Sequence, residues 1–156
     1  RREVSQADLE AQQALLLSIR DKISQAHEGI SQLRRVNEQL SFWHNQFADS
    51  ADASDVVAAA KALQAKLAEV EDVLILPGEQ EDTFGLNERT RLNEKLSSLI
   101  SIVGSADAKP TKQARELAAE YSGEIDQQLE TLSELLDGEV AAFNSMVKEA
   151  SLPAVG

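Results

Sequence analysis

The sequence predicts an all-α protein, and three observations lead to this prediction. Apolar residues recur at alternating steps of three and four over residues 9–47, which is the spacing of one face of a long helix. Aromatic residues make up only 4% of the chain, and its composition is that of long-helix proteins. No stretch shows the two-residue alternation of a strand. With 156 residues, 42% of them hydrophobic, the chain is long enough for one domain with its own core.

The first helix is predicted to run from Ser5 to about Phe47. Ser5 is a favourable N-cap residue, and Asp8 follows three positions later, as in a capping box. A helix of about 40 residues is about 60 Å long, so other helices must cover its apolar stripe. The stripe consists of Leu9, Gln12, Leu16, Ile19, Ile23, Ala26, Ile30, Leu33, Asn37, Leu40, His44 and Phe47.

Two features of this stripe give specific expectations. We expect Ile23, Ile30 and Leu33 to lie at the centre of the core. Gly29 lies beside the stripe, and we expect a partner helix to approach closely there, because glycine leaves room for it.

The second helix is predicted to begin at Ser54 or Asp55 and to end at Pro77-Gly78. The acidic stretch 79–85 follows as a loop, with Phe84 and Leu86 returning to the core. The inward residues of this helix are Val56, Ala60, Leu63, Leu67, Val70 and Leu74.

The third helix is predicted from about Asn87 to Val103, with Gly104 at its C-terminal end. Its inward residues are Leu92, Leu96, Leu99 and Val103.

The fourth helix is predicted from Pro110 or Thr111 to about Ala150. Gly138 interrupts the composition, but the apolar pattern continues through it in phase, which indicates one continuous helix. The inward residues are Ala114, Ala118, Tyr121, Ile125, Leu129, Leu132, Leu136, Val140, Phe143 and Val147.

The predicted lengths favour an elongated antiparallel three-helix bundle over residues 1–156. The first and last helices are about twice as long as the second and third, so the two short helices can form one broken middle helix. The alternative is an up-down four-helix bundle with the two short helices side by side. Since the chain has neither an N-terminal methionine nor a signal peptide, we expect it to be part of a larger protein.

The charge distribution excludes two classes of partner. The net charge is −12, and residues 49–82 carry nine acidic residues and two lysines. Nucleic-acid binding and binding to an anionic membrane surface both require a basic surface. The chain also has no apolar run long enough to span a membrane.

The residue pattern predicts no catalytic site, no cofactor and no metal. There is no cysteine, and the two histidines, His27 and His44, are about 25 Å apart along one helix. The acidic groups at 49–55 and 79–82 lack the spacing of a calcium loop and are explained by helix caps and a solvated loop. The glutamates of the fourth helix lack the Glu-x-x-His pairs of a di-metal bundle.

Phe42 and Trp43 are the candidate functional residues. Adjacent residues on a helix point in different directions, so we expect one ring to be exposed or to cover the end of the bundle. An exposed aromatic residue is typical of a docking surface.

Several stretches resemble the helical region at the C-terminus of large bacterial secreted proteins with sortilin-like or Asp-box β-propellers, which are often labelled glycosyl hydrolases. They are Ser5-Gln-Ala-Asp-Leu-Glu-Ala-Gln12, Leu92-Asn-Glu-Lys-Leu-Ser-Ser-Leu99, Ser105-Ala-Asp-Ala-Lys-Pro-Thr-Lys-Gln113, Ala142-Phe-Asn144 and Leu152-Pro-Ala-Val155. The resemblance implies an extracytoplasmic accessory bundle at the C-terminus of such a protein. Any glycosidase-like site would belong to the propeller, so no catalytic residue is assigned here.

Two functions therefore follow from the sequence. The first is a non-catalytic structural or interaction module that docks on the other domains of the larger protein, self-associates or binds a partner. The alternative is an accessory carbohydrate-binding domain, for which Phe42 and Trp43 are the available aromatic residues.

Overall fold

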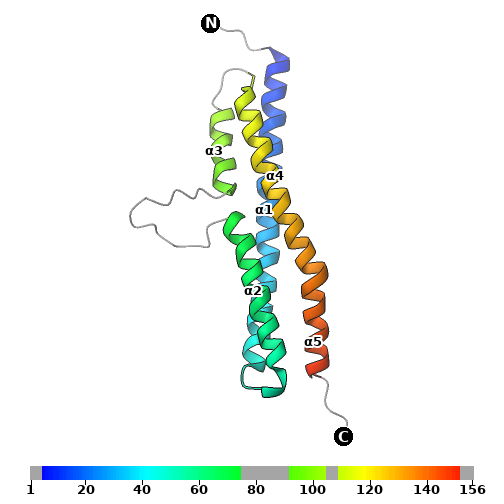
Figure 1. Ribbon diagram of the computed structural model, residues 1–156. Helices are drawn as coiled ribbons and strands as arrows, with labels where there is room; N and C mark the ends of the chain where they lie inside the picture. Colours follow the sequence, from blue (N-terminus) through cyan, green and yellow to red (C-terminus); the bar gives the residue numbers. More distant parts are fainter. Residues whose placement is uncertain (1–4, 75–91, 105–108, 152–156) are drawn as a thin grey trace, which may run out of the picture. The chain divides into compact units, whose positions relative to one another are not determined.

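The structure is a computed structural model that describes residues 5–74, 92–104 and 109–151 (Figure 1). Every regular element within these ranges is helical. The predicted all-α class is therefore confirmed for the part of the chain that the structure describes.

Some of the predictions concern residues outside these ranges. They are the helix end at Pro77-Gly78, the loop 79–85 with Phe84 and Leu86, and the helical start at Asn87.

The first helix, α1, spans Gln6–Phe47, as predicted. The backbone N–H of Asp8 donates to the hydroxyl of Ser5 over 3.1 Å, which is the hydrogen bond of an N-cap. This bond satisfies one of the N–H groups that have no partner at the start of a helix, so the helix begins where the sequence places it.

A short 3₁₀ turn, η1 (Ala51–Ala53), connects α1 to α2 (Ser54–Leu74). All six residues predicted to face inward from α2 are buried. The spacing of these residues thus identified the buried face of this helix correctly.

The helix α3 spans Leu92–Gly104, and Leu96, Leu99 and Val103 are buried as predicted. The side-chain amide of Gln12 on α1 donates to the carbonyl oxygen of Val103 over 2.6 Å. This bond satisfies a carbonyl at the C-terminal end of α3, where the helix itself offers no donor.

The last helical segment begins with α4 (Lys112–Glu134) and continues through η2 (Leu135–Val140) into α5 (Ala141–Ser151). Thr111 is the N-cap of α4, because its hydroxyl accepts a hydrogen bond of 3.0 Å from the backbone N–H of Ala114. The helix thus starts at one of the two predicted positions.

The segment η2 modifies the prediction of one uniform helix. The chain stays helical through Gly138, but it winds as a π-helix over Leu135–Val140. Here Leu135 is buried and Leu136, which was predicted to face inward, is half-buried. A π-helical turn holds more residues than an α-helical one, so the eight-residue step from Leu135 to Phe143 fits two turns and both side chains lie on the buried face.

The stripe of α1 is buried mainly in its middle. Ile30 and Leu33 are in the core, as predicted, but Ile23 is only half-buried. Its neighbours along the stripe, Ile19 and Ala26, are fully buried instead. Near the start of the helix Leu9 is 46% exposed, so the periodic pattern extends beyond the segment that is covered.

Gly29 allows a close approach between α1 and α4, as predicted. A Cβ atom at this position would lie 2.5 Å from Cδ2 of Leu129, which is closer than side-chain atoms pack. The end of the Leu129 side chain occupies this space and would have to shift if another residue replaced Gly29.

The chain divides into two compact units. The first contains residues 1–28 and 72–128, and the second contains residues 29–71 and 129–156. Within each unit, the segment of α1 and the segment from α4 onward run in the same direction (Figure 1). A third helix runs opposite to them, α3 in the first unit and α2 in the second.

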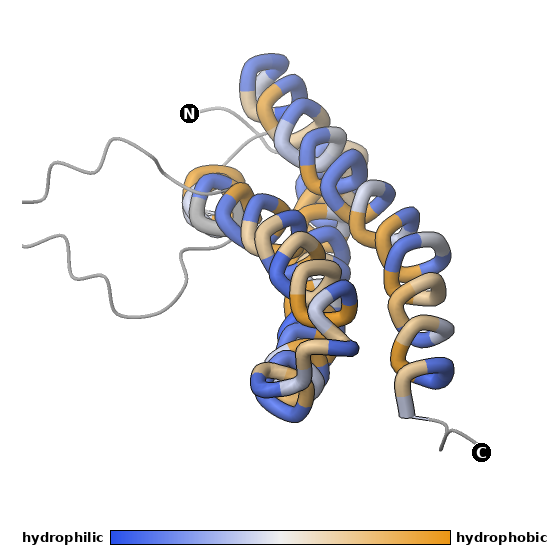
Figure 2. The backbone as a smooth tube through the Cα atoms, turned by 60° about the horizontal axis from the view of Figure 1, so that its bottom comes forward, coloured by the Kyte–Doolittle hydropathy of each residue, from blue (hydrophilic) through white to orange (hydrophobic). Residues whose placement is uncertain are grey.

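The helices of both units are amphipathic. Hydrophobic residues recur along each helix between stretches of hydrophilic ones (Figure 2). No polar or charged residue is buried among those that the structure describes. The core of each unit is therefore apolar, and polar groups lie at its edges or on the surface.

Candidate docking surface

Phe42 and Trp43 lie near the C-terminal end of α1, in the second unit. Phe42 is 57% exposed, and Trp43 is half-buried. Successive residues of an α-helix are about 100° apart around its axis, so one ring must turn away from the core when the other turns toward it. Of the two expected outcomes, an exposed ring or a ring that covers the end of the bundle, the structure shows the exposed ring for Phe42.

Phe47 joins these two residues in an aromatic cluster, a name we use for Phe42, Trp43 and Phe47. The rings of Phe42 and Trp43 meet edge-to-face, with centroids 5.1 Å apart and planes at 79°. Trp43 and Phe47 are stacked, with centroids 5.9 Å apart and planes at 22°. Both arrangements are favourable for aromatic pairs, so the exposed ring of Phe42 is supported by Trp43, which in turn stacks on Phe47.

The sequence analysis placed Phe47 on the apolar stripe but did not connect it with Trp43. The signal was present, because residues four positions apart are neighbours on a helix surface. Half of the six aromatic residues of the chain lie within this six-residue stretch.

The polypeptide just before the aromatic cluster is fixed to α2. The side-chain amide of Gln64 donates to the hydroxyl of Ser41 over 2.8 Å and to the carbonyl oxygen of Asn37 over 3.3 Å. Nearer the middle of α1, Arg34 forms an ion pair of 2.8 Å with Glu71. Because these contacts hold α1 against α2, Phe42 is exposed on an ordered helix.

The sequence on both sides of the aromatic cluster is acidic. Glu38 lies one turn before Phe42 and is exposed, and the exposed residues Asp49, Asp52 and Asp55 follow at the turn and at the start of α2. The sequence contains no lysine or arginine between residues 35 and 61. The carboxylates that flank the aromatic cluster in the sequence are thus not interspersed with lysine or arginine.

Other exposed apolar side chains do not form such a group. Leu9, Leu17, Val73 and Ile102 are exposed in the first unit, and all of them are aliphatic. Among the residues that the structure describes, Phe42 is the exposed aromatic one. Single exposed aliphatic residues are common on protein surfaces, whereas an exposed ring supported by two others is not.

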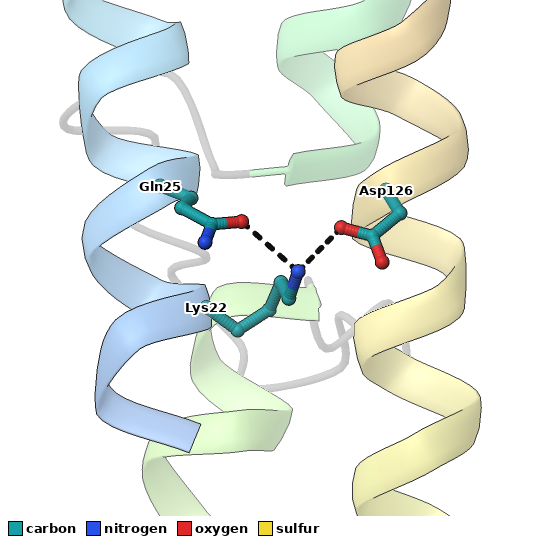
Figure 3. A network of polar contacts seen from close by, with 3 residues as sticks. All are labelled: Lys22, Gln25 and Asp126. Carbon is teal, nitrogen blue, oxygen red and sulfur yellow. Dashed lines mark hydrogen bonds and ion pairs between the residues drawn. The ribbon is translucent and has the colours of Figure 1, made fainter. Parts of the chain in front are cut away.

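A network of three polar side chains connects α1 and α4 in the first unit (Figure 3). Lys22 Nζ lies between the two helices, 2.9 Å from Oε1 of Gln25 and 2.5 Å from Oδ1 of Asp126. The Lys22 side chain is 18% exposed, and its ammonium group is paired with the carboxylate of Asp126. This network therefore links two helices and offers no unpaired charge to a ligand.

The histidines do not form a site. His27 is exposed, and His44 is half-buried, with Nδ1 3.5 Å from Oδ1 of the neighbouring Asn45. Within residues 5–74, 92–104 and 109–151, no three His, Asp or Glu side chains are grouped closely enough to hold a metal ion. Over the same ranges, no helix has both the length and the apolar character needed to cross a membrane.

Comparisons with protein-family models, curated proteins and solved structures gave no match to this chain.

Proposed function

We propose that this protein is a non-catalytic structural and interaction module that docks on another polypeptide through Phe42 and Trp43. The observation that carries the proposal is the exposed ring of Phe42, which is supported by Trp43 and Phe47 on an ordered helix. Aromatic residues are enriched among those that contribute most to protein–protein binding. A ring already held in place loses little conformational freedom on binding, which favours affinity.

The partner in this proposal is another domain of the same larger protein. The support comes from the resemblance to the C-terminal helical region of bacterial secreted β-propeller proteins, which implies an accessory bundle in an extracytoplasmic setting. Self-association is the second route by which the same surface would be covered.

The proposed architecture is an elongated antiparallel three-helix bundle in which α2 and α3 together form a broken middle helix. Its support is that each unit by itself consists of three helical segments, with the middle one running opposite to the other two. The alternative is an up-down four-helix bundle, in which α1 and the segment from α4 onward would run in opposite directions.

A distance measurement separates these two architectures. Spin labels at Ser5 and Ala150 should lie about 60 Å apart in the three-helix bundle, because the chain enters at one end and leaves at the other after helices of about 40 residues. In the four-helix bundle both termini share one end, and helices packed about 10 Å apart would give a distance near 20 Å. Pulsed electron-spin resonance would measure the distance directly.

Amide hydrogen exchange tests the proposed docking. Residues 38–55 should exchange more slowly in the proposed longer protein than in the isolated chain, because docking would cover this surface. The substitution Phe42→Ala in the longer protein should abolish the difference, while Leu17→Ala, which truncates an exposed residue of the first unit, should leave it unchanged. Equal exchange in the longer protein and the isolated chain would refute docking at this surface.

Carbohydrate binding is the second candidate, and the exposed ring of Phe42 is also the observation that favours it. Aromatic rings flanked by polar groups are a common platform for sugars. Calorimetric titration of the chain with oligosaccharides, compared with Phe42→Ala, tests this alternative. Saturable binding that the substitution removes would favour the carbohydrate role over docking on a polypeptide.

A further inference from the structure

We propose that the aromatic cluster binds a cationic polypeptide segment, with an arginine side chain of the partner stacked on the ring of Phe42. This inference rests on the proposed interaction role and adds the chemistry of the partner. It combines two features of the same stretch of the second unit, the exposed aromatic ring and the exposed acidic residues that flank it in the sequence.

The aromatic ring provides the apolar part of the surface. Phe42 is 57% exposed, while its edge-to-face contact with Trp43 and the stacking of Trp43 on Phe47 fix its position. A ring in such a setting attracts a cation placed over its face. It also offers the apolar stem of that cation a surface to cover.

The charge around the ring determines which partner fits. The exposed carboxylates of Glu38, Asp49, Asp52 and Asp55 lie on both sides of the aromatic cluster in the sequence, with no lysine or arginine between residues 35 and 61. Complementary charge increases the rate and specificity of association, and like charges oppose it. A second copy of this acidic chain, a nucleic acid or an anionic membrane would each bring negative charge to this surface.

Arginine is better suited than lysine to bind both the exposed ring and a carboxylate next to it. Its planar guanidinium group stacks on an aromatic face and can still direct N–H groups toward a neighbouring carboxylate. Lysine carries its charge at a compact and strongly hydrated ammonium group, which cannot stack in this way. We therefore expect the surface to distinguish peptides that have the same net charge.

Trp43 is the only tryptophan of the chain, so its fluorescence reports directly on the aromatic cluster. The probes are three capped peptides. The first contains Arg-Ser-Leu-Ser repeated three times. The second and third have lysine and glutamate, respectively, in place of every arginine. We expect saturable changes in Trp43 fluorescence with the arginine peptide, binding several-fold weaker with the lysine peptide, and no binding with the glutamate peptide. Affinity for the arginine peptide should also fall as salt is added, because the contact is partly electrostatic.

Two substitutions at Phe42 separate the contribution of its aromatic character to peptide binding from that of its apolar surface. Phe42→Ala should weaken binding of the arginine peptide about tenfold, as expected for a residue at the centre of an interface. Phe42→Leu keeps an apolar side chain but removes the aromatic face. It should therefore lower the affinity for the arginine peptide and reduce the difference in affinity between the arginine and lysine peptides. Since Phe42 is exposed, both variants should keep the helical circular dichroism of the wild type.

Matched charge variants test whether the acidic residues act locally. The triple substitution Asp49→Asn, Asp52→Asn and Asp55→Asn should weaken binding about tenfold. The control makes the same charge change on exposed residues of α4, with Glu120→Gln, Glu124→Gln and Glu130→Gln, and should leave binding nearly unchanged. Leu17→Ala is the control for an exposed apolar residue elsewhere.

Several results would overturn the proposal. Equal weakening by the two triple variants would mean that the peptide responds only to net charge. If the wild type and Phe42→Ala bind the arginine peptide with equal affinity, the ring of Phe42 does not contribute to binding. If residues 38–55 are protected in the longer protein but the arginine peptide does not bind, the docking role stands and the cationic partner is wrong. If they are not protected, the docking role itself fails, whatever the peptide does.

Discussion

Two successive parts of α1 are both apolar but differ in structure. Residues 29–40 are aliphatic at their inward positions except Asn37, and Ile30, Leu33 and Leu40 are buried there. Residues 42–47 contain three aromatic side chains, none of which is fully buried. The first part keeps a helical period, whereas the second places two large apolar residues next to each other.

The difference shows how an apolar sequence divides between core and surface. A periodic set of aliphatic residues lies on one side of a helix and can be covered by neighbouring helices. Adjacent aromatic residues cannot all reach that side, so one of them remains exposed whatever the packing. The departure from the period, more than the apolar character itself, marks the candidate docking surface.

The largest expected effect tests the aliphatic part. Ile30→Ala should lower the free energy of unfolding by about 2–5 kcal/mol, because it removes buried methyl and methylene groups and leaves a cavity. Glu28 is exposed two positions earlier in the same helix, and Glu28→Ala should change stability by less than about 0.5 kcal/mol. Urea unfolding followed by circular dichroism measures both. Equal losses at the two positions would mean that the inward face of α1 is assigned wrongly.

A smaller effect is expected at Gly29, where packing and helix propensity oppose each other. Alanine favours a helix over glycine by about 1 kcal/mol, but its Cβ would displace the far end of the half-buried Leu129 side chain. Because that side chain can move, we expect a cost at the lower end of the range for overpacking, about 1 kcal/mol. Gly29→Ala should therefore lack the stabilisation of about 1 kcal/mol that alanine gives at an open helical position.

Gly123 provides the matched control for this substitution. It lies in α4, and a Cβ atom there would meet nothing within 4 Å. Gly123→Ala should therefore stabilise the protein by about 1 kcal/mol, which is the propensity effect alone. In a Leu129→Ala background the cost at Gly29 should disappear. If the two glycine substitutions have the same effect without that change, the close approach of α1 and α4 is not present in solution.

The extent to which the fold could be predicted from sequence depended on local regularity. The inward face of α2 was predicted completely, because its six positions follow one period and are all covered. The π-helical turn at Leu135–Val140 was not predicted, because Leu135 and Leu136 are both apolar and either one fits an inward position. Which of them is buried depends on how the turn winds, and the sequence period alone does not determine this.

The candidate site was predicted only in part. The adjacency of Phe42 and Trp43 predicted that one ring is exposed, and the geometry of a helix is sufficient for that prediction. The sequence does not decide which ring, because Gln64 on α2 covers the neighbouring side of α1 through contacts between residues far apart in the chain. For the same reason the half-burial of Ile23 could not be deduced from its place on the stripe.

The smallest expected effect tests the aromatic part of α1. Phe42→Ala removes a ring that is more than half exposed, and it loses an edge-to-face pair worth about 0.5–1.5 kcal/mol. Alanine also has the higher helix propensity, by a few tenths of a kcal/mol, which offsets part of this loss. The free energy of unfolding should therefore fall by less than about 1 kcal/mol, while the fluorescence of Trp43 changes because its neighbouring ring is gone. The same urea titrations give the comparison with Ile30→Ala. A loss as large as that at Ile30 would place Phe42 in the core and remove the basis for treating it as a docking residue.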